Sequence, residues 1–370
     1  MVDVAEADRY VPDMNTVQIA SEKRRTPPFA RLGAFVARYR WPVLIGYLVT
    51  AMVFGVFGVQ VFGTMKSEGF IDPGGEAARA ATVLQDDFGT TDPAVVVVIQ
   101  TPTDVDTDAA AATALLDEVA TVPGVEGIVS YWSTGSPQLR SEDGRTAQAF
   151  IYGDPDADRE QLASDIVDNY TGQREGLDVY AFGGEVIGNA FTELISGDIA
   201  RAESIAVPLT AILLIFVLGS VVAAGLPFLV AIGTILGSFL VLYLISLATD
   251  VSIFSLNLVT GLGLALGIDY ALLIINRFRE ELSAGRAVPD AVATTVNTAG
   301  KTVFVSGLTV AVALASLLFF PQYFLRSFGY AGIAVSVLAV LGALTAIPAL
   351  LAILGPRINK LKVRRGDLTP

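Results

Sequence analysis

Cysteine and histidine are both absent from this chain of 370 residues. Their absence excludes thiol catalysis, disulfide bonds, histidine-ligated haem, ordinary zinc sites and any Ser-His-Asp triad. Charge is also scarce, since Asp, Glu, Lys and Arg make up only 16% of the residues, where soluble domains have about 25%. Apolar residues are abundant instead, at 53% of the chain. This composition indicates a protein that lies largely within a membrane.

The few charges are unevenly distributed. Between Gly63 and Ala200 there are 25 Asp and Glu residues against 6 Lys and Arg, which leaves 12 acids and 18 bases for the rest of the chain. One acidic region is therefore separate from the apolar runs, and the bases gather at the edges of those runs. An acidic polar region argues against nucleic acid as a partner.

Six apolar runs have the character of transmembrane helices. We expect them at Trp41–Phe62, Ile205–Leu218, Leu226–Leu247, Ile253–Ile275, Thr302–Phe320 and Phe328–Leu354. The chain then divides into a tail with a basic amphipathic helix on the membrane surface (1–40), the first span (41–62), the acidic domain (63–200), spans two to six (201–356) and a basic tail (357–370). The first run is too long for a signal peptide and lacks its cleavage site.

Basic residues predict the orientation. They precede the first span, follow the fourth (Arg277, Arg279, Arg286) and follow the sixth. Bases favour the cytoplasmic side, and an even number of spans places both termini on one side. We therefore expect an inner (plasma) membrane protein with both termini in the cytoplasm and the acidic domain outside.

The acidic domain alternates strands and helices. β-Branched and alternating segments predict strands at 93–100, 125–132, 146–152 and 177–182, with helices at 107–122 and 158–170. Asp106 or Thr107 is the expected N-cap of the first helix. The order βαββαβ is that of ferredoxin-like folds. Flanking helices are expected at 74–88 and 186–202, the second running into a span.

Asp269 is the only acid deep within a predicted span, because Glu203 and Asp250 lie near span ends. A carboxylate at that depth costs at least about 2.5–3.5 kcal/mol on insertion scales. Binding a proton is the cheapest way to neutralise it, so we expect Asp269 to carry protons. The alternative is a structural aspartate that accepts a hydrogen bond from a neighbouring helix.

Small and polar residues surround Asp269 at helical spacing. One face has Asn257, Gly261, Ala265 and Asp269, and an adjacent stripe has Thr260, Gly263, Gly267 and Tyr270. The fifth span has a stripe of its own, with Thr302, Ser306, Thr309, Ala313 and Ser316. Small residues let helices approach closely. We therefore expect the fourth and fifth spans to pack together, with Ser306 as a further relay residue near the carboxylate.

Several segments together resemble the MmpL branch of the resistance-nodulation-division superfamily. They are GLGLALGIDYALLIINRFREEL from Gly261, NTAGKTVFVSGLTVAVAL from Asn297, FPQYFLRSFGYAGIAV from Phe320 and PALLAILG from Pro348. The resemblance implies a proton-driven exporter of envelope lipids or other amphiphiles, with no cofactor besides the proton gradient. It also implies that Asp269 and Tyr270 belong to the proton relay, and that the acidic domain is a porter domain that holds substrate.

The chain departs from this family in size. The resemblance implies two similar halves with an Asp-Tyr pair each, whereas this sequence has one half and one pair. It could form a homodimer, pair with a separate second half, or be an inactive fragment. A non-transporting membrane scaffold is a further possibility, and a half-subunit like SecF of the protein-export machinery has similar topology.

Two enzyme classes fit poorly. Intramembrane aspartyl proteases need a GxGD motif and a second aspartate, but Gly267-Ile268-Asp269 has other spacing and no second mid-span acid exists. The GLGLALG run is not followed by the lysine of a phosphate-binding loop, so its glycines indicate helix packing. The sequence thus favours a transporter over an enzyme, and does not identify residues that bind substrate.

Overall fold

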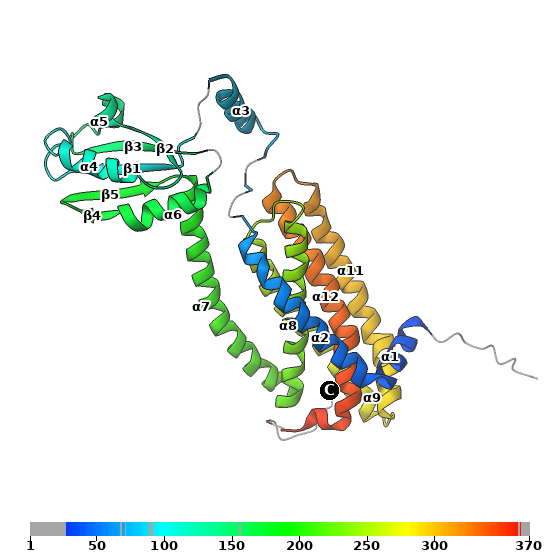
Figure 1. The fold of residues 1–370 in the computed structure, drawn as a ribbon. Helices are drawn as coiled ribbons and strands as arrows, with labels where there is room; N and C mark the ends of the chain where they lie inside the picture. The colour runs from blue at the N-terminus through cyan, green and yellow to red at the C-terminus, as the bar shows by residue number, and fades with distance from the viewer. Residues whose placement is uncertain are drawn as a thin grey trace, which may run out of the picture.

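The computed structural model describes residues 27–66, 69–70, 72–88, 92–154, 157–361 and 363. It has a helical bundle and a small sheet domain, joined by the long helix α7, Gly184–Leu218 (Figure 1). The polar tail expected before residue 27, with Lys23 to Arg25, lies outside the described residues, as do the terminal bases Lys362, Arg364 and Arg365.

Within the described residues, the bundle contains five helices that are long and apolar enough to cross a membrane. The first is α2 (Arg40–Gly58), which a 3-10 turn extends to Gly63. The other four are α8 (Val221–Ser246), α9 (Ser255–Ser283), the continuous run of α10 (Val288–Thr295) into α11 (Lys301–Ala315), and α12 (Tyr323–Leu354). The second expected span, Ile205–Leu218, corresponds to Ser204–Leu218, a shorter apolar stretch within α7. The chain is therefore a multi-pass membrane protein.

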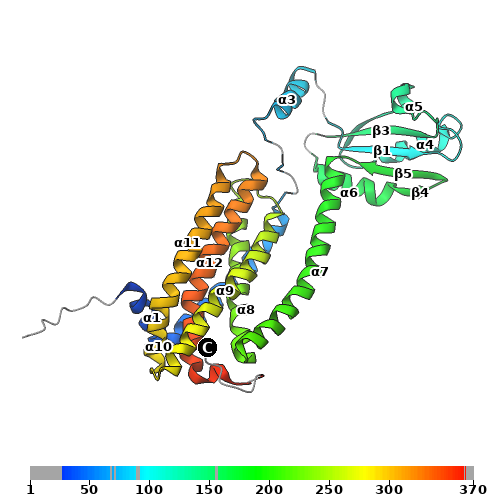
Figure 2. The same ribbon diagram turned by 180° about the vertical axis from the view of Figure 1, so that it is seen from behind.

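Helix α12 forms the centre of the bundle and packs against α2, α8, α9 and α11 (Figure 2). Its buried face is rich in alanine and glycine, which leave room for neighbouring side chains. An added Cβ on Gly332 would meet Leu314 of α11, and one on Gly329 would meet Leu318 in the 3-10 turn that follows α11. Close packing around α12 holds the other spans in a fixed order.

The long helix α7 ends where the chain must reverse. Gly219 has a φ of 62°, a left-handed conformation that favours glycine after the end of a helix. The hydroxyl of the next residue, Ser220, caps α8 by accepting from the Ala223 N–H. It also donates to the carbonyls of Ile358 and Lys360, at 2.8 and 2.7 Å. The turn is thereby attached to the segment that follows α12.

The sheet domain has five antiparallel strands in the order β2-β3-β1-β5-β4. They are β1 (Val95–Gln100), β2 (Val125–Ser130), β3 (Thr146–Gly153), β4 (Gly172–Arg174) and β5 (Leu177–Phe182). Helices α4 (Ala109–Val119) and α6 (Arg159–Tyr170) bury apolar residues against the sheet. β-Branched valines fill β1 and form the middle of this core.

The four expected strands and both expected helices are present, with shifted ends. Helix α4 begins after Asp108 rather than Asp106 or Thr107, because both precede it in a turn. The sequence did not predict β4 or the single turn of α5 (Tyr131–Thr134). The N-cap residue of α5, Ser130, forms a capping box with Ser133. Helix α3 (Glu76–Phe88) and α7 confirm the two flanking helices, including the direct run of α7 into its apolar stretch.

Helix α1 (Pro28–Arg38) coincides with the expected amphipathic helix, but its apolar face packs against protein. Gly33 and Val36 are buried, and a Cβ on Gly33 would lie 2.8 Å from the Cα of Ala293 in α10. The ring centroids of Phe29 and of Phe304 in α11 are 5.7 Å apart. The face that we expected to meet lipid is therefore largely used to close one end of the bundle.

Candidate functional site

Helix α9 holds the Asp269-Tyr270 pair in its middle. Asp269 is the fifteenth residue of this 29-residue helix. The helix continues beyond Ile275, where we expected the span to end, because the following charges pair along it. Arg277 meets Glu280 at 2.6 Å and Glu281 at 2.5 Å, the spacing at which opposite charges support a helix.

One side of α9 packs tightly against α8. A Cβ on Gly267 would lie 2.7 Å from the Cα of Ala231, and a Cβ on Gly263 would lie 2.9 Å from the side chain of Ile235. Two backbones can approach this closely only where a side chain is missing. Gly263 and Gly267 are therefore packing residues, as expected, but their neighbour is α8.

The adjacent face of α9 is uncovered. Gly261, Ala265 and Asp269, spaced by four, are all exposed, and a Cβ added to Gly261 would meet nothing within 4 Å. Asn257, at the start of this row, is half-buried. Among the described residues Asp269 has no hydrogen-bond or ion-pair partner. A narrow row of small residues with one carboxylate thus lies open on the side of the bundle.

Tyr270 has the opposite environment. Its side chain is 5% exposed, and its hydroxyl is buried without a hydrogen-bond partner in the described chain. That hydroxyl would be 3.4 Å from a Cβ on Gly307 in α11, and the backbone oxygen of Ser336 in α12 would be 3.6 Å from the same point. Consecutive residues of a helix point about 100° apart, so Tyr270 faces the bundle interior while Asp269 faces out.

Ser336 is a residue that sequence reasoning missed. Its hydroxyl is buried and unpartnered in the described structure, and its backbone oxygen lies near the point where Tyr270 reaches α11. Thr234 and Ser238 of α8 also have buried hydroxyls without a hydrogen-bond partner among the described residues. Unsatisfied buried hydroxyls need an explanation such as an ordered water or a proton-transfer role. A lone serine within the apolar run of α12 was the available signal.

The prediction that the fourth and fifth spans pack together through their polar stripes is wrong. Helix α11 packs on α12, and α9 packs on α8 and α12. The hydroxyl stripe of α11 is exposed, including Thr302, Ser306 and Thr309. Thr302 and Thr309 donate to carbonyls of their own helix at 3.5 and 2.9 Å. The physical reason is Gly307, which lets Val340 of α12 approach α11 on the opposite face.

The basic end of α9 is also less solvated than we expected. Arg279 is 5% exposed and Glu281 is 4% exposed. Two charged side chains in the segment that we expected to be a solvated basic cluster are therefore buried. Glu281 binds both Arg277 and Arg286 at 2.5 Å. Arg279 donates from Nη1 to the carbonyl of Leu218, the last residue of α7, at 2.9 Å. The RFREE sequence indicates ion pairs between its bases and acids, but it does not show which of these side chains are buried in the bundle.

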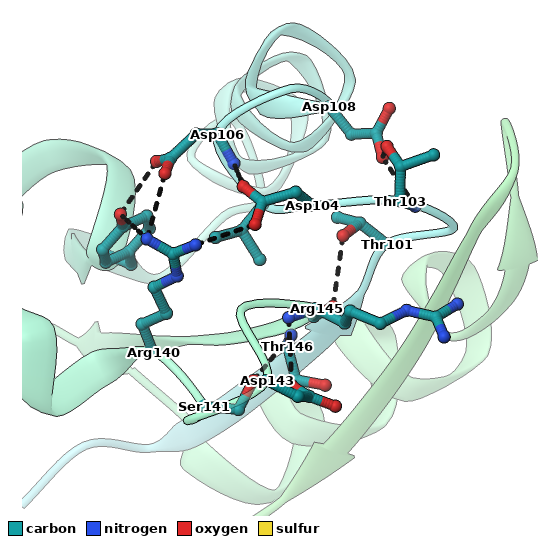
Figure 3. A network of polar contacts seen from close by, with 12 residues as sticks. Thr101, Thr103, Asp104, Asp106, Asp108, Arg140, Ser141, Asp143, Arg145 and Thr146 are labelled. Atoms are coloured by element: carbon teal, nitrogen blue, oxygen red, sulfur yellow. Dashed lines mark hydrogen bonds and ion pairs between the residues drawn. The ribbon is translucent and has the colours of Figure 1, made fainter.

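A second polar cluster lies in the sheet domain, at the end of β1 (Figure 3). Arg140 binds Asp104 at 2.8 Å and Asp106 at 3.0 Å, and the Tyr131 hydroxyl donates to Asp106 at 2.8 Å. The hydrogen bond to Asp106 raises the pKa of Tyr131 above its ordinary value. This network joins the loop after β1 to the turn before β3.

The turn has its own titrating group. The Ser141 hydroxyl donates to Asp143 at 2.6 Å and the Arg145 N–H donates to it at 3.0 Å. These hydrogen bonds stabilise the carboxylate and lower the pKa of Asp143. Within the described residues no group of three acids is placed to hold a metal ion. The cluster therefore has the character of a structural network that closes this end of the sheet.

Comparison with known proteins relates the whole arrangement to one family. The family model described as "MMPL family" matches residues 70–368. A membrane protein of Streptomyces coelicolor is 39% identical over 334 residues, which are 87% of this chain and 46% of that protein. The trehalose monomycolate exporter MmpL3 of Mycolicibacterium smegmatis is 34% identical over 350 residues, 90% of this chain and 34% of that protein.

A third relative is the mycolic acid-containing lipids exporter MmpL11 of Mycolicibacterium smegmatis, which is 29% identical over 338 residues. These residues cover 89% of this chain and 35% of the relative. The chain thus spans between a third and a half of the length of the curated relatives that it matches.

Proposed function

The chain belongs to the MMPL family, and we propose that it acts as one half of a proton-driven exporter of a cell-envelope lipid or similar amphiphile. The observation that supports this best is the exposed carboxylate of Asp269 halfway along α9. Against lipid such a group is costly, at least about 2.5–3.5 kcal/mol. Against a second half it would be covered and could take up a proton.

The row of Gly261, Ala265 and Asp269 is suited to that second half. Two small residues spaced by four allow a facing helix to approach within backbone distance, and nothing in the described chain occupies that space. We propose that two halves place their α9 helices face to face, as a homodimer or with a separately encoded partner. The two carboxylates would then lie near the pseudo-twofold axis.

In this arrangement protons reach Asp269 from outside the membrane and leave toward the cytoplasm. Tyr270 would link the site to the interior through its buried hydroxyl, which approaches Gly307 of α11 at the point that the Ser336 backbone oxygen also approaches. Ser306, exposed on α11, would join only if the partner half reaches it. The energy source is the proton gradient, so no nucleotide or other cofactor is required.

We propose six membrane crossings, with the apolar end of α7 as the second along the chain. Ser204–Leu218 has 15 residues, a rise of about 22 Å, and the preceding turns of the same helix extend it toward the ~30 Å of a bilayer core. Six crossings keep every basic cluster on the cytoplasmic side. The sheet domain is then outside the inner membrane.

The sheet domain serves as the porter in this proposal. Its order β2-β3-β1-β5, without the short β4, and its βαββαβ connectivity support a ferredoxin-like fold. The relatives named as exporters of trehalose monomycolate and of mycolic acid-containing lipids point to a long-chain lipid as the substrate class. An amphiphile held by a domain outside the membrane would come from the outer leaflet.

The decisive experiment is proton movement in proteoliposomes that contain the purified chain. An entrapped pH-sensitive dye would report protons released by an imposed pH gradient, with and without a fluorescent long-chain amphiphile. We expect Asp269→Asn to abolish amphiphile-dependent proton movement while leaving insertion and unfolding temperature unchanged.

The matched control is Asp250→Asn, which removes an acid that pairs with Lys66 at 2.9 Å at the end of the bundle. It should retain the flux. Equal flux in Asp269→Asn and the unaltered chain would exclude the relay. A chain that assembles with a partner but never shows Asp269-dependent flux would instead be the non-transporting scaffold.

A further inference from the structure

Helices α9, α10 and the segment after α12 meet at the end of the bundle away from the sheet domain (Figure 2). Residues of these three segments line a cavity. Its volume is about 510 Å³, within the range of small-molecule sites. The residues that line it include Arg279, Ser283, Arg286 and Asn359. No acid is among the described lining residues. A cavity of this size with two arginines is suited to a negatively charged group.

The charges around the cavity leave one positive charge unbalanced. Glu280 and Glu281 pair with Arg277, and Glu281 also pairs with Arg286. Two acids therefore meet two bases, and Arg279 remains without an ionic partner in the described structure. Arg279 is nevertheless 95% buried, since its exposed fraction is 5%. A buried charge without a counter-ion is costly.

The free atoms of Arg279 form a recognisable donor set. Nη1 is used by the Leu218 carbonyl at 2.9 Å, whereas Nε and Nη2 are buried with no hydrogen-bond partner in the described chain. Nε and Nη2 form one edge of the planar guanidinium, and such an edge donates two parallel hydrogen bonds to a phosphate or carboxylate. The Leu218 carbonyl, at the end of α7, offsets only part of the charge.

Asn359 adds a second requirement. Its side-chain oxygen is buried and unpartnered in the described structure, and it accepts hydrogen bonds only. A ligand that satisfies both residues therefore has an anionic group beside a hydrogen-bond donor. A phosphodiester that carries a glycerol hydroxyl has this combination.

From these contacts we infer that the cavity binds an anionic phosphate group, with Arg279 as its main ligand and Asn359 as the acceptor for a neighbouring hydroxyl. The group belongs either to a phospholipid headgroup or to a free phosphate compound. This site is separate from Asp269 and does not depend on the transport proposal. Because Arg279 also holds the end of α7, an occupied site would help to fix the helix that leads to the sheet domain.

The test uses the full chain in nanodiscs and native mass spectrometry. Phosphatidylglycerol mixed with phosphatidylcholine is the lipid probe, and retained lipid is counted after release. We expect Arg279→Gln to retain about ten-fold less phosphatidylglycerol, the effect of losing hydrogen bonds to a charged group. Arg357→Gln is the control, since Arg357 is exposed at the same end and is absent from the cavity lining. An equal loss of phosphatidylglycerol in both variants would mean that basic surface residues attract the lipid in general, and this result would overturn the site.

A second pair of variants guards against misfolding of Arg279→Gln. Ser283 is an exposed lining residue, so Ser283→Asp places a carboxylate in the cavity while Arg279 stays. We expect Ser283→Asp to lose phosphatidylglycerol and Ser283→Asn to keep it. Equal retention by these two variants would contradict the inference.

A final arm distinguishes the sources of the phosphate. Lipid-free detergent samples are titrated with glycerol phosphate by isothermal calorimetry. Saturable binding that Arg279→Gln abolishes would assign the site to soluble phosphates, whereas retention of phosphatidylglycerol alone would assign it to a headgroup. Binding of neither probe by the unaltered chain would overturn the site.

Discussion

At the scale of single residues, two glycines of α9 lie in opposite environments. Gly267 faces the backbone of α8 at Ala231, where an added Cβ would lie 2.7 Å from the Cα. Gly261 faces open space on the row that contains Asp269. The same substitution at the two positions therefore separates packing within the chain from packing against a partner.

We predict that Gly267→Val destabilises the chain by about 1–3 kcal/mol, the usual cost of overpacking, because α8 and α9 must move apart. Gly261→Val should leave the unfolding temperature of the solitary chain nearly unchanged, since its side chain meets nothing. Thermal unfolding in detergent, followed by intrinsic fluorescence, provides the comparison. Similar shifts for both variants would show that the observed α8–α9 contact is not the one that limits stability.

At the scale of elements, the sheet domain is closed at the end of β1 by the network of Figure 3. The Asp143 carboxylate has a lowered pKa because it accepts from Ser141 and from the Arg145 N–H. A lowered pKa stabilises the fold above the ordinary aspartate pKa, and this contribution is lost as the pH falls through the lowered value. Tyr131 behaves in the opposite sense: its contribution holds below the ordinary tyrosine pKa and is lost as the pH rises through the raised value.

We predict that acid loosens the turn before β3 earlier than the rest of the sheet. Hydrogen exchange of peptides covering 140–146, corrected for intrinsic rates, should accelerate as the pH falls through the pKa of Asp143. Asp143→Asn should remove most of this acid dependence, because no carboxylate is left to protonate there. An unchanged acid response in that variant would assign the effect to another group.

Helix α7 is the element that connects the two parts of the molecule. Its 35 residues rise about 52 Å, from the sheet domain to the Leu218 carbonyl held by Arg279. Most of its apolar side chains beyond Ile205 are exposed, Phe216 by 72% for example. A long helix that is held mainly at its ends can transmit movement between the bundle and the sheet domain.

At the scale of the whole molecule, one side of the helical bundle is uncovered. It covers 46% of the Streptomyces relative and 34% of MmpL3. The face with Gly261, Ala265 and Asp269 is open, as is the hydroxyl stripe of α11. The proposed second half would cover the carboxylate.

We predict that Ala265→Cys forms a disulfide-linked dimer in the membrane on mild oxidation. The chain has no cysteine of its own, so every cross-link reports the introduced thiol. Ala265 lies on the open face one turn before Asp269, where two facing α9 helices would bring the thiols together. Non-reducing electrophoresis measures the dimer.

Met52→Cys is the control, because Met52 is 72% exposed but lies on α2. Cross-linking at Ala265 alone would support a homodimer through α9. Cross-linking at both positions would indicate random collision. Cross-linking at neither position would contradict a homodimer through α9 and favour a separately encoded half.

Much of the element order could be read from the sequence, because length and periodicity of apolar residues report local structure. Four of the five described strands and five of the spans lie where these patterns predict them. Element ends were less accurate: α9 runs past Ile275 because charge pairs extend it, and β4 has only three exposed residues with no apolar pattern. The sequence named candidate residues for the site, but it did not show which helices surround each of them.

The sequence by itself determined that one carboxylate lies within a membrane helix, since hydrophobicity and spacing along the chain are enough to establish this. Only the tertiary structure decided which neighbour covers each face of that helix. A period of 3.6 residues shows that a helix has distinct faces, but it does not show what covers each face. Side-chain volume and the path of α12 determine that α8 meets Gly267, that α11 packs mainly on α12 and that Asp269 stays open. The burial of Arg279 has the same origin, because it depends on where α7 ends and not on the residues beside it.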